Sequence, residues 1–475
     1  MAVISKQENL FEGLKYVFVD EYQDTNRLQE RIVKNIAKNC NFVAVGDAKQ
    51  GIYGFRLATC EILLGDIDKF EEDENSTVKY LKSNFRSDQR VLDFVNDVFK
   101  VCMQKDVTRI DYLESSMLEA KNPFENDGAK AVCIDIVKEP EKEPVVLPEL
   151  YSVKNDEVRI NSADLKQILD VKNRIFEVMR GKIFEKEEFR PCKYGDIAIL
   201  VRDRKALFNN LEMFLSESGI PVSANSKIKL NEEVEIQVLI NWLKVCLNFD
   251  DEIALLSVLL SPFGEFSLEE IIEIKGEESL CDLAKNDNHF EKFRQRVERF
   301  NKNLLCFGAK VALLEVFNET NYRSYINIKP LANKLNNYVD LFLSVVEQSG
   351  LEFDLPALIH HFESVDFSIN QEIRENADSV LLTTIHNSKG LEYPIVFLVG
   401  CDKSLTSVAD SYDVKINENY GLALKYYDVE QNQEFVGARM MAIANDKKHS
   451  DFVEELMIFY VALTRAKNKL FLFGK

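Results

Sequence analysis

The first hundred residues alternate between short apolar runs and segments whose apolar side chains repeat at helical spacing. Each apolar run ends in polar residues, Asp20-Glu21 after the first and Gly46-Asp47 after the second. Strands that end in polar residues and lead into helices are typical of a parallel α/β sheet, which binds ligands at the carboxyl ends of its strands. The pattern predicts buried strands at 16–19 and 42–45 and helices at 28–37 and 91–102.

The rest of the chain places a long helical stretch between further strand signals. Apolar side chains repeat at helical spacing from about 227 to 375. Three of the ten prolines fall within 139–149, which predicts a loop or spacer. The order indicates an all-helical block inserted into an α/β domain. Further strands are expected at 131–137, 197–201, 380–384, 395–399 and 470–473, and a long helix at about 452–466.

Length and composition limit the class of protein. A chain of 475 residues has room for about three domains. With 59 Lys and Arg against 79 Asp and Glu, the net charge is −20, which at first sight disfavours nucleic acid as a partner. The nine cysteines include no CxxC pair and have no zinc-site spacing from the five histidines, so unpaired thiols are expected. No apolar run reaches about 18 residues and the N-terminus lacks a signal-peptide core, so we expect a cytoplasmic protein without a membrane span.

Two segments near the N-terminus carry candidate phosphate chemistry. Asp20 at a strand end is a suitable oxygen ligand for Mg²⁺, and the neighbouring Glu21 can polarise a water for attack on a phosphoryl group. Gln50 lies in a glycine-containing loop, where an amide can sense a terminal phosphate. Alone, an Asp-Glu pair after a strand is more often a solvated strand end.

Aromatic and cationic residues interleave just after Gln50. Tyr53, Phe55 and Arg56 have the composition of a base-stacking platform, although by composition alone the two aromatic residues could equally belong to the core. Arg86 lies close to the start of the helix at 91–102, where a cation opposes the helix dipole, so we expect an anionic partner, either an acidic side chain or a phosphate.

The C-terminal third contributes two further candidate segments. Lys389-Gly390 forms a cationic turn between two predicted strands, near His386, which can donate or accept, and Glu392, which can accept from a ribose hydroxyl. Arg465 stands at the end of the predicted helix at 452–466. An Arg presented at a domain edge can stabilise the charge that builds up in phosphoryl transfer.

These segments, in this order, resemble the later motifs of superfamily 1 DNA helicases of the UvrD/PcrA/Rep kind, and they look closest to the AddA and RecB branch. The similarity covers nearly the whole chain. The helical stretch at 230–267 also resembles the inserted subdomain of AddA. The matching strings are DEYQDTN (20–26), GDAKQGIYGFR (46–56), NFRS (84–87), TIHNSKGLEYP (384–394) and YVALTRAK (460–467).

The resemblance implies an α/β motor of two RecA-like P-loop NTPase domains with ATP between them. The first RecA-like domain is expected to be incomplete, at 1–75, and the second complete, in two segments at 76–226 and 376–475. The all-helical inserted subdomain is expected at 227–375. Such a motor grips one strand by stacking and a few backbone contacts, so a net charge of −20 does not exclude DNA.

The resemblance also implies roles for individual residues. Asp20 would bind Mg²⁺ and Glu21 would activate the water. Gln50, Arg86 and Arg465 would contact the γ-phosphate of ATP, and Glu392 would bind its ribose. Single-stranded DNA would contact Tyr53, Phe55, Arg56, Thr384 and His386. The implied activity is ATP-dependent 3′→5′ translocation or unwinding in DNA repair or recombination.

The sequence departs from this family in four respects. It contains no G-x-x-x-x-G-K-[ST] phosphate loop; the string nearest to one, RGKI at 180–183, lacks the first glycine and the hydroxyl. Only 19 residues precede Asp20, so we expect the chain to begin inside the first RecA-like domain. Gly51 and Gly54 stand where AddA-like proteins usually have Ser and Arg, and Phe55 stands where UvrD-like members have Trp. The nuclease domain of AddA and RecB is not found.

Three hypotheses follow. The first is a helicase motor that needs a missing N-terminal segment in cis or in trans, as a split gene product or fragment, and whose further partner is a nuclease subunit; the isolated chain should then hydrolyse ATP negligibly. The second is an ATPase-inactive DNA-binding or regulatory module. The third, a nuclease using Asp20 and Glu21, is disfavoured because the further carboxylates and lysine of such a site are missing.

Overall fold

The computed structural model describes residues 13–121, 128, 130–136, 162–185, 188–203, 206–224, 227–276, 278–329, 332–365, 368–370, 378–402, 414–417, 419–428 and 433–474. The chain divides into two units by its internal contacts. The first comprises Met1–Glu212, Pro221–Ser223 and Ala377–Lys475, and the second comprises Met213–Ile220 and Ala224–Asn376. The predicted loop at 139–149 lies outside the described residues.

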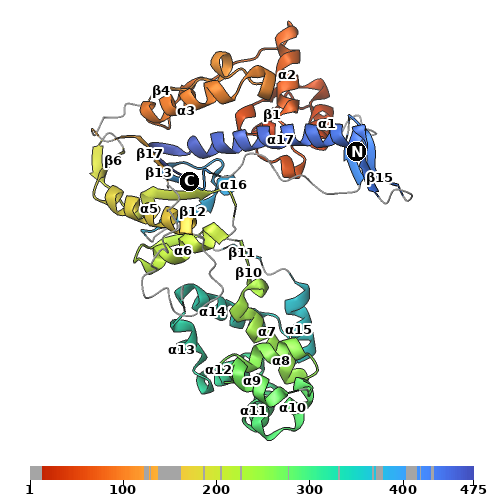
Figure 1. Ribbon diagram of the computed structural model, residues 1–475. Coiled ribbons are helices and arrows are strands. Elements are labelled where there is room, and N and C mark those ends of the chain that lie inside the picture. The colour runs from red at the N-terminus through yellow and green to blue at the C-terminus, as the bar shows by residue number, and fades with distance from the viewer. Residues whose placement is uncertain are drawn as a thin grey trace. The chain divides into compact units, whose positions relative to one another are not determined.

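A six-stranded sheet forms the centre of the first unit, in the order β5-β17-β13-β8-β12-β9. Figure 1 labels β12, β13 and β17 of this sheet. The pairs that join β5, β17, β13, β8 and β12 are parallel, and β8 is buried along its whole length. A parallel sheet covered on both faces reads as a continuous apolar run, which explains why sequence pattern located five of these strands. Their bounds are Val132–Ile136 (β5), Ile197–Val201 (β8), Val222–Ala224 (β9), Val380–Thr384 (β12), Tyr393–Val399 (β13) and Ala466–Gly474 (β17).

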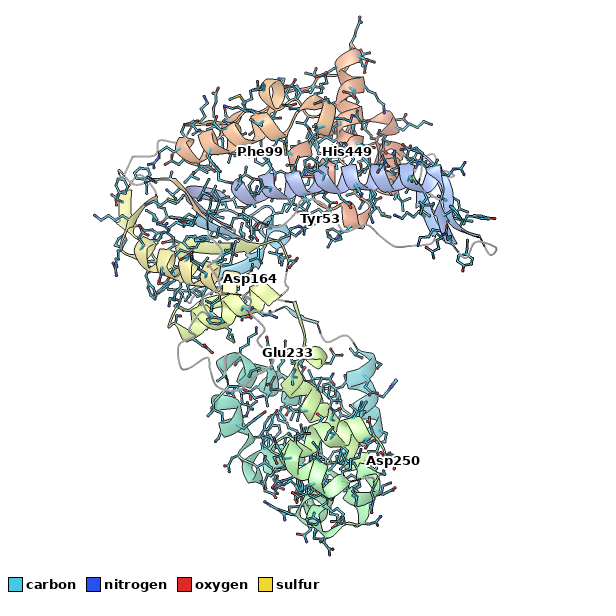
Figure 2. All side chains as sticks on the ribbon, viewed as in Figure 1. Tyr53, Phe99, Asp164, Glu233, Asp250 and His449 are labelled. Carbon is cyan, nitrogen blue, oxygen red and sulfur yellow. The ribbon has the colours of Figure 1, made fainter. Side chains whose placement is uncertain are left out.

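Two helices that pack on each other link this sheet to the N-terminal part of the unit. Helix α3 (Gln89–Cys102), capped by the Asp88 carboxylate, and helix α17 (Ala438–Leu463) both contact β17. Phe99 of α3, which Figure 2 labels, lies with its ring centroid 5.1 Å from that of Tyr460 on α17. Thus the core of the first unit is continuous from α3 through α17 to the sheet.

Helix α17 differs from the prediction of a helix at 452–466. It begins earlier, at Ala438, and ends at Leu463, just before Thr464 and Arg465. Its first half escaped detection because it buries few apolar side chains: Met440 and Ile443 form a small separate cluster with Ala423. Apolar periodicity appears only where the helix joins the main core.

The first two strands pair in parallel but are not buried as the apolar runs predicted. Strands β1 (Tyr16–Val19) and β2 (Asn41–Ala44) alternate between exposed and half-buried residues, and Phe18 is 72% exposed. The predicted helix between them is present as α1 (Arg27–Ile36), with Asn26 as its N-cap in a capping box with Gln29. The apolar runs therefore predicted the strands correctly and their burial wrongly, because one face of this pair has no cover in the described chain.

The remaining elements of the first unit are short or peripheral. All nine cysteines lie in described residues and are free thiols, as expected. Among the helices in the described part of the chain, none is long and apolar enough to cross a membrane. These further elements are α2 (Glu61–Glu72), β3 (Ser83–Asn84), α4 (Lys105–Thr108), β4 (Glu119–Ala120), α5 (Ser162–Met179), β6 (Lys182–Glu185), β7 (Glu188–Pro191), β14 (Val414–Asn417), β15 (Gly421–Asp428) and β16 (Gln433–Val436); α6 (Ala206–Glu217) runs across the boundary of the two units.

The second unit is built around one aromatic core. Trp242 packs its ring 5.1 Å from Phe263 and 5.6 Å from Phe300. The helices are α7 (Val234–Leu247), α8 (Glu252–Leu259), α9 (Leu268–Lys275), α10 (Leu280–Asn286), α11 (Glu291–Phe307), α12 (Ala309–Glu319), α13 (Tyr322–Asn327), α14 (Ala332–Gln348) and α15 (Leu355–Ser364).

The stretch predicted to be helical from 227 to 375 also contains two short strands among its described residues. Strands β10 (Lys227–Lys229) and β11 (Ser368–Asn370) pair antiparallel where the chain enters and leaves the helices. Such pairing depends on residues far apart in sequence, which local periodicity does not report.

Candidate functional site

The Asp-Glu pair lies at the end of β1, where the chain turns sharply into the short helix Tyr22–Asp24. Glu21 has φ 51° and ψ 41°, a left-handed conformation that is unusual for a residue other than glycine. The Asp20 carboxylate accepts from the Glu21 backbone N–H at 2.9 Å, and the Glu21 carboxylate accepts from the Gln23 amide at 2.6 Å. Both carboxylates are exposed, whereas Gln23 is buried. The turn thus presents two oriented acids at the strand end.

A hydrogen-bonded chain connects these acids to the loop after β2. The buried Gln23 accepts from the Asp47 backbone N–H at 3.0 Å. Asp47 in turn accepts from Lys49 Nζ at 2.6 Å and from the Gln50 amide at 2.9 Å. Lys49 and the Gln50 amide hold the pKa of the Asp47 carboxyl below its usual value even though burial opposes this. Two intermediate residues, Gln23 and Asp47, therefore connect Glu21 to Gln50 and fix their relative positions.

Arg465 reaches Gln50 from the far end of the sequence. Its Nη2 lies 3.4 Å from Gln50 Oε1, and its other nitrogens donate to the carbonyls of Val461 at 2.9 Å and Leu391 at 3.0 Å. The side chain is 1% exposed. Burial, and then the like charge of Arg86, lower the pKa of Arg465 to about 10. An anion placed here would relieve both penalties.

Arg86 has an acidic side chain as a partner, which is one of the two kinds of anion predicted for it. Its Nε lies 2.5 Å from one oxygen of Glu392, and Lys467 Nζ lies 2.9 Å from the other. These two cations hold the pKa of Glu392 below its usual value against the effect of burial. Glu392, predicted to bind a ribose, is therefore paired with both cations.

Lys389 is the connection that sequence reasoning missed. Its Nζ donates to both oxygens of Asp24, at 2.7 and 2.6 Å, and to the backbone carbonyl of Gln50 at 2.7 Å. It also lies 3.8 Å from Glu21 Oε2. Burial raises the pKa of Asp24 despite these bonds from Lys389. A Lys-Gly turn signals a cation, but nothing in its local sequence identifies a partner 365 residues away.

A second group of residues surrounds an exposed ring. Phe55 is 65% exposed, which excludes it from the core. Its ring centroid lies 5.7 Å from that of His386, and Tyr53 lies 6.5 Å from the same His386. The Arg56 guanidinium stands 5.1 Å from the Tyr53 ring and 5.4 Å from the Phe55 ring, close enough for cation–π attraction. Four of the five predicted DNA contacts thus lie together. Figure 2 labels one of them, Tyr53.

Thr384 is the fifth predicted DNA contact and does not join this group. It is 8% exposed, and its hydroxyl caps the short helix α16 (Ile385–Ser388) by accepting from the Asn387 N–H at 3.4 Å. Thr384 therefore caps, and so stabilises, the helix that carries His386.

The donor set for a metal is sparse. Among described residues, no three or more His, Cys, Asp or Glu side chains gather where they could hold a metal ion. A single carboxylate at a strand end still fits Mg²⁺, which is commonly bound by one or two carboxylates together with phosphates and water. Asp20 therefore fits a shared nucleotide–metal site and not an all-protein cage.

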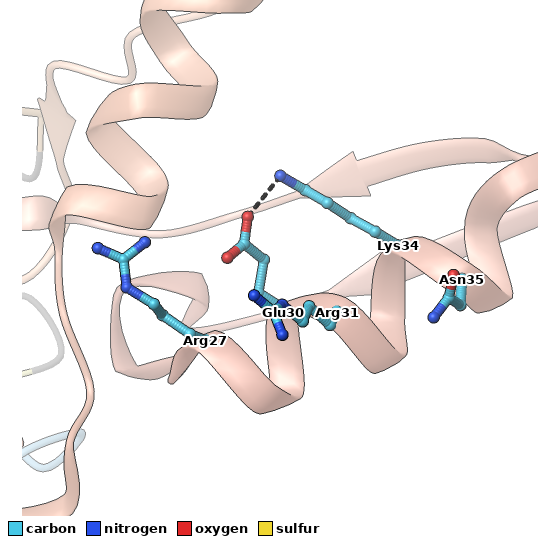
Figure 3. Close-up of a pocket in the computed structure, with 5 residues that line it drawn as sticks. All are labelled: Arg27, Glu30, Arg31, Lys34 and Asn35. Atoms are coloured by element: carbon cyan, nitrogen blue, oxygen red, sulfur yellow. Dashed lines mark hydrogen bonds and ion pairs between the residues drawn. The ribbon is translucent and has the colours of Figure 1, made fainter. Parts of the chain in front are cut away.

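A separate hollow runs along α1. It has a volume of about 420 Å³ and is lined by Arg27, Glu30, Arg31, Lys34 and Asn35 (Figure 3). Lys34 bonds Glu30 at 2.7 Å and Asp66 at 2.9 Å. None of the predicted site residues lines this hollow.

Sequence comparison defines the class to which this arrangement belongs. The family described as UvrD-like helicase C-terminal domain matches residues 79–474, and the family described as UvrD/REP helicase N-terminal domain matches residues 5–71. The chain therefore belongs to the UvrD-like helicase family.

Similar proteins are named as the AddA-type subunit of an ATP-dependent helicase/nuclease. The proteins of Alkaliphilus oremlandii, Clostridium kluyveri and Clostridium beijerinckii are 30%, 28% and 29% identical to this chain, each over 98% of it. The matches cover 40%, 41% and 41% of those proteins, so the chain spans about two fifths of their length.

Proposed function

We propose that this chain provides the nucleotide-responsive and strand-gripping parts of an ATP-dependent 3′→5′ DNA translocase of the UvrD/AddA type, acting on single-stranded DNA in repair or recombination. The observation that carries the proposal is the contact between Arg465 and Gln50, 415 residues apart in sequence. It joins an arginine just after α17 to the amide of the loop after β2, beside the Asp-Glu pair.

The residues around Gln50 fit the polyphosphate of ATP. Arg465 and Arg86 are cations near enough to repel each other, and the first is almost fully buried. Such a pair is stabilised by an anion between its members. ATP supplies a phosphoanhydride bond for hydrolysis when bound.

The proposed roles follow from charge and reach. Asp20 holds Mg²⁺, and Glu21 accepts a proton from the attacking water. Gln50 contacts the γ-phosphate, as do Arg86 and Arg465, which offset the negative charge that develops there. Glu392 binds the ribose after giving up one of its two cations.

The exposed aromatic group is the proposed grip on DNA. Phe55 and Tyr53 offer ring faces for bases, and Arg56 and His386 lie beside them. Stacking tolerates any base, which suits a motor that moves along a strand.

We propose that a phosphate-loop segment, in cis or in trans, completes the motor, and that a nuclease subunit is a further partner. The relatives are named as part of a helicase/nuclease and are much longer than this chain. The exposed face of β1 and β2 supports a covering segment, because parallel strands are normally buried on both faces. The first RecA-like domain is thus proposed to be incomplete at 1–75, followed by the second at 76–226 and 376–475 with its helical insertion at 227–375.

An ATPase-inactive DNA-binding module is the second candidate. It is favoured by the lack of a G-x-x-x-x-G-K-[ST] string in the 475 residues.

One experiment separates the two. ATP hydrolysis stimulated by single-stranded DNA is measured for the chain alone and for the chain joined to the phosphate-loop segment of a UvrD-like relative. The motor proposal expects negligible turnover alone and robust turnover after joining, lost in Glu21→Gln and retained in the exposed control Glu74→Gln. No turnover in the joined protein that still binds DNA would favour the inactive module, and robust turnover by the chain alone would contradict the need for a segment.

A further inference from the structure

One face of α17 follows the loop between residues 49 and 54. Lys49 Nζ lies 5.4 Å from the centre of the Tyr460 ring. A side-chain carbon added to Gly51 would lie 3.8 Å from the Met457 sulfur. The last contact of this series joins Gly54 to Glu454. The three helix positions are spaced by three residues, so they share one face of the helix.

The Gly54 contact is a direct hydrogen bond. The Gly54 backbone N–H donates to Glu454 Oε1 at 3.0 Å. A Cβ at position 54 would lie 2.6 Å from Glu454 Oε2 and 2.9 Å from Oε1, so even an alanine would displace the carboxylate. The contact in its present form therefore depends on glycine at this position.

The nearby cation Arg202 forms its hydrogen bonds with Glu455, whereas the Glu454 carboxylate accepts from the Gly54 N–H. Arg202 is held by the next carboxylate, Glu455, through three contacts of 2.5–2.9 Å. Burial raises the pKa of Glu454, and the Gly54 N–H opposes that rise. A half-buried carboxylate gains most from a fixed backbone donor.

The bond is located at the start of the turn that carries the exposed aromatic residue. Gly54, Phe55 and Arg56 form one short helical turn. Helix α17 ends at Leu463, about two and a half helical turns after Glu454, and Arg465, which contacts Gln50, follows two residues later. Helix α17 and the residues just after it thus contact both ends of this loop, at Gln50 and at Gly54.

We infer that Glu454 is a positioning residue that fixes the turn Gly54–Arg56 on α17, so that Phe55 and Arg56 move with the helix that leads directly into Arg465. The inference rests on the proposed function for its DNA consequence. The hydrogen bond itself is tested independently of that function.

Amide hydrogen exchange of peptides covering 51–57 tests the bond. Glu454→Ala removes the acceptor and should speed exchange of the Gly54 amide by about tenfold or more. Glu454→Gln keeps an acceptor oxygen and should stay within about threefold of the unsubstituted chain. Gly54→Ala should match Glu454→Ala, and the double variant should add little to either. Glu455→Ala, the neighbouring carboxylate bonded to Arg202, is the matched control and should leave the 51–57 peptides unchanged.

Affinity for a fluorescent oligo-dT strand tests the consequence. Glu454→Ala should weaken binding about three- to tenfold, and Glu454→Gln should restore it. Unchanged exchange in Glu454→Ala overturns the inference. Faster exchange with unchanged affinity also overturns it, provided that Phe55→Ala weakens binding. If neither the unsubstituted chain nor its Phe55→Ala variant binds the strand measurably, the proposed DNA grip fails, and the exchange data alone decide whether Glu454 holds the turn.

Discussion

The ammonium of Lys389 bridges both oxygens of Asp24, at 2.7 and 2.6 Å, and the backbone carbonyl of Gln50, at 2.7 Å. Its side chain is 6% exposed and that of Asp24 is 20% exposed. One cation therefore joins the segment after the Asp-Glu pair, the loop of Gln50 and the turn after α16. These are the parts that must keep their relative positions if Glu21 and Gln50 act on one phosphate.

Replacing this cation should destabilise the first unit. Lys389→Met leaves the Asp24 carboxylate largely buried without its cation, and such a loss costs on the order of 3 kcal/mol. The free energy of unfolding is measured by far-UV circular dichroism in urea. Because the chain has one tryptophan, Trp242 in the second unit, its fluorescence should report an unchanged transition there.

The double variant Lys389→Met with Asp24→Leu is the control. It removes both charges and should recover most of the lost stability, because a buried ion pair replaced by apolar residues is often neutral. Equal destabilisation in the single and double variants would contradict an ion pair as the source.

Arg465 offers a second test, for which alanine is a poor replacement. Since the guanidinium also satisfies the carbonyls of Val461 and Leu391, Arg465→Ala combines loss of charge with loss of structure. Arg465→Lys keeps the charge, but one ammonium cannot reproduce the fork of four hydrogen bonds that the guanidinium makes. In the joined motor we expect kcat to fall by about 10³-fold, as for other arginines that offset phosphoryl-transfer charge.

Arg439→Lys is the matched control for that variant. Arg439 is exposed near the start of α17, the helix that precedes Arg465, and donates to the Leu422 carbonyl at 3.3 Å. Its replacement should leave kcat unchanged. If Arg465→Lys, like Arg439→Lys, left the kcat of the joined motor unchanged, Arg465 would not act on the reacting phosphate.

The sequence pattern predicted the sheet well because parallel strands buried on both faces are continuous apolar runs. Residues 197–201 and 395–399 are such runs and lie in neighbouring strands. Strands of the 414–436 region went undetected, since exposed apolar side chains such as Ile416 and Tyr426 give no clean alternation. The start of α17 was missed for the related reason that few of its residues reach a core.

Candidate site residues could be proposed from the sequence, whereas their partners could not. Gln50 and Arg465 were recognisable by residue type and position, but their contact depends on folding across 415 residues. Arg86 was expected to have an anionic partner, and only the structure identifies Glu392. Gln23 has no local signal, and the Lys389-Gly390 turn indicates a cation without its partners, because each residue acts through bonds to distant segments.

The open face of the β1–β2 pair predicts association through apolar surface. Tyr16, Phe18 and Val45 are 57%, 72% and 54% exposed on these strands and just after them. We expect a dye that responds to apolar surfaces to bind the chain, and binding to fall in Phe18→Ser and after joining of the phosphate-loop segment. Phe435→Ser, on β16 and 42% exposed, is the control for loss of an aromatic residue elsewhere. Dye binding that is unaffected by both Phe18→Ser and joining would contradict a covering segment at this face.

His386 should make the first unit less stable in mild acid. Burial and then the charge of Arg202 lower its pKa from the usual 6.5. The unfolded chain therefore takes up a proton near pH 6.5 while the folded chain resists it, so the free energy of unfolding should fall as the pH drops below about 6.5. Glu455 and the Ile52 backbone oppose this shift, and Lys389 strengthens it. His386→Phe keeps a ring against Phe55 but cannot titrate, so its stability measured by circular dichroism should fall less steeply between pH 6.5 and the lower pKa. Trp242 fluorescence should show the same pH dependence in both proteins, and an unaltered dichroism slope in His386→Phe would show that His386 is not the group responsible.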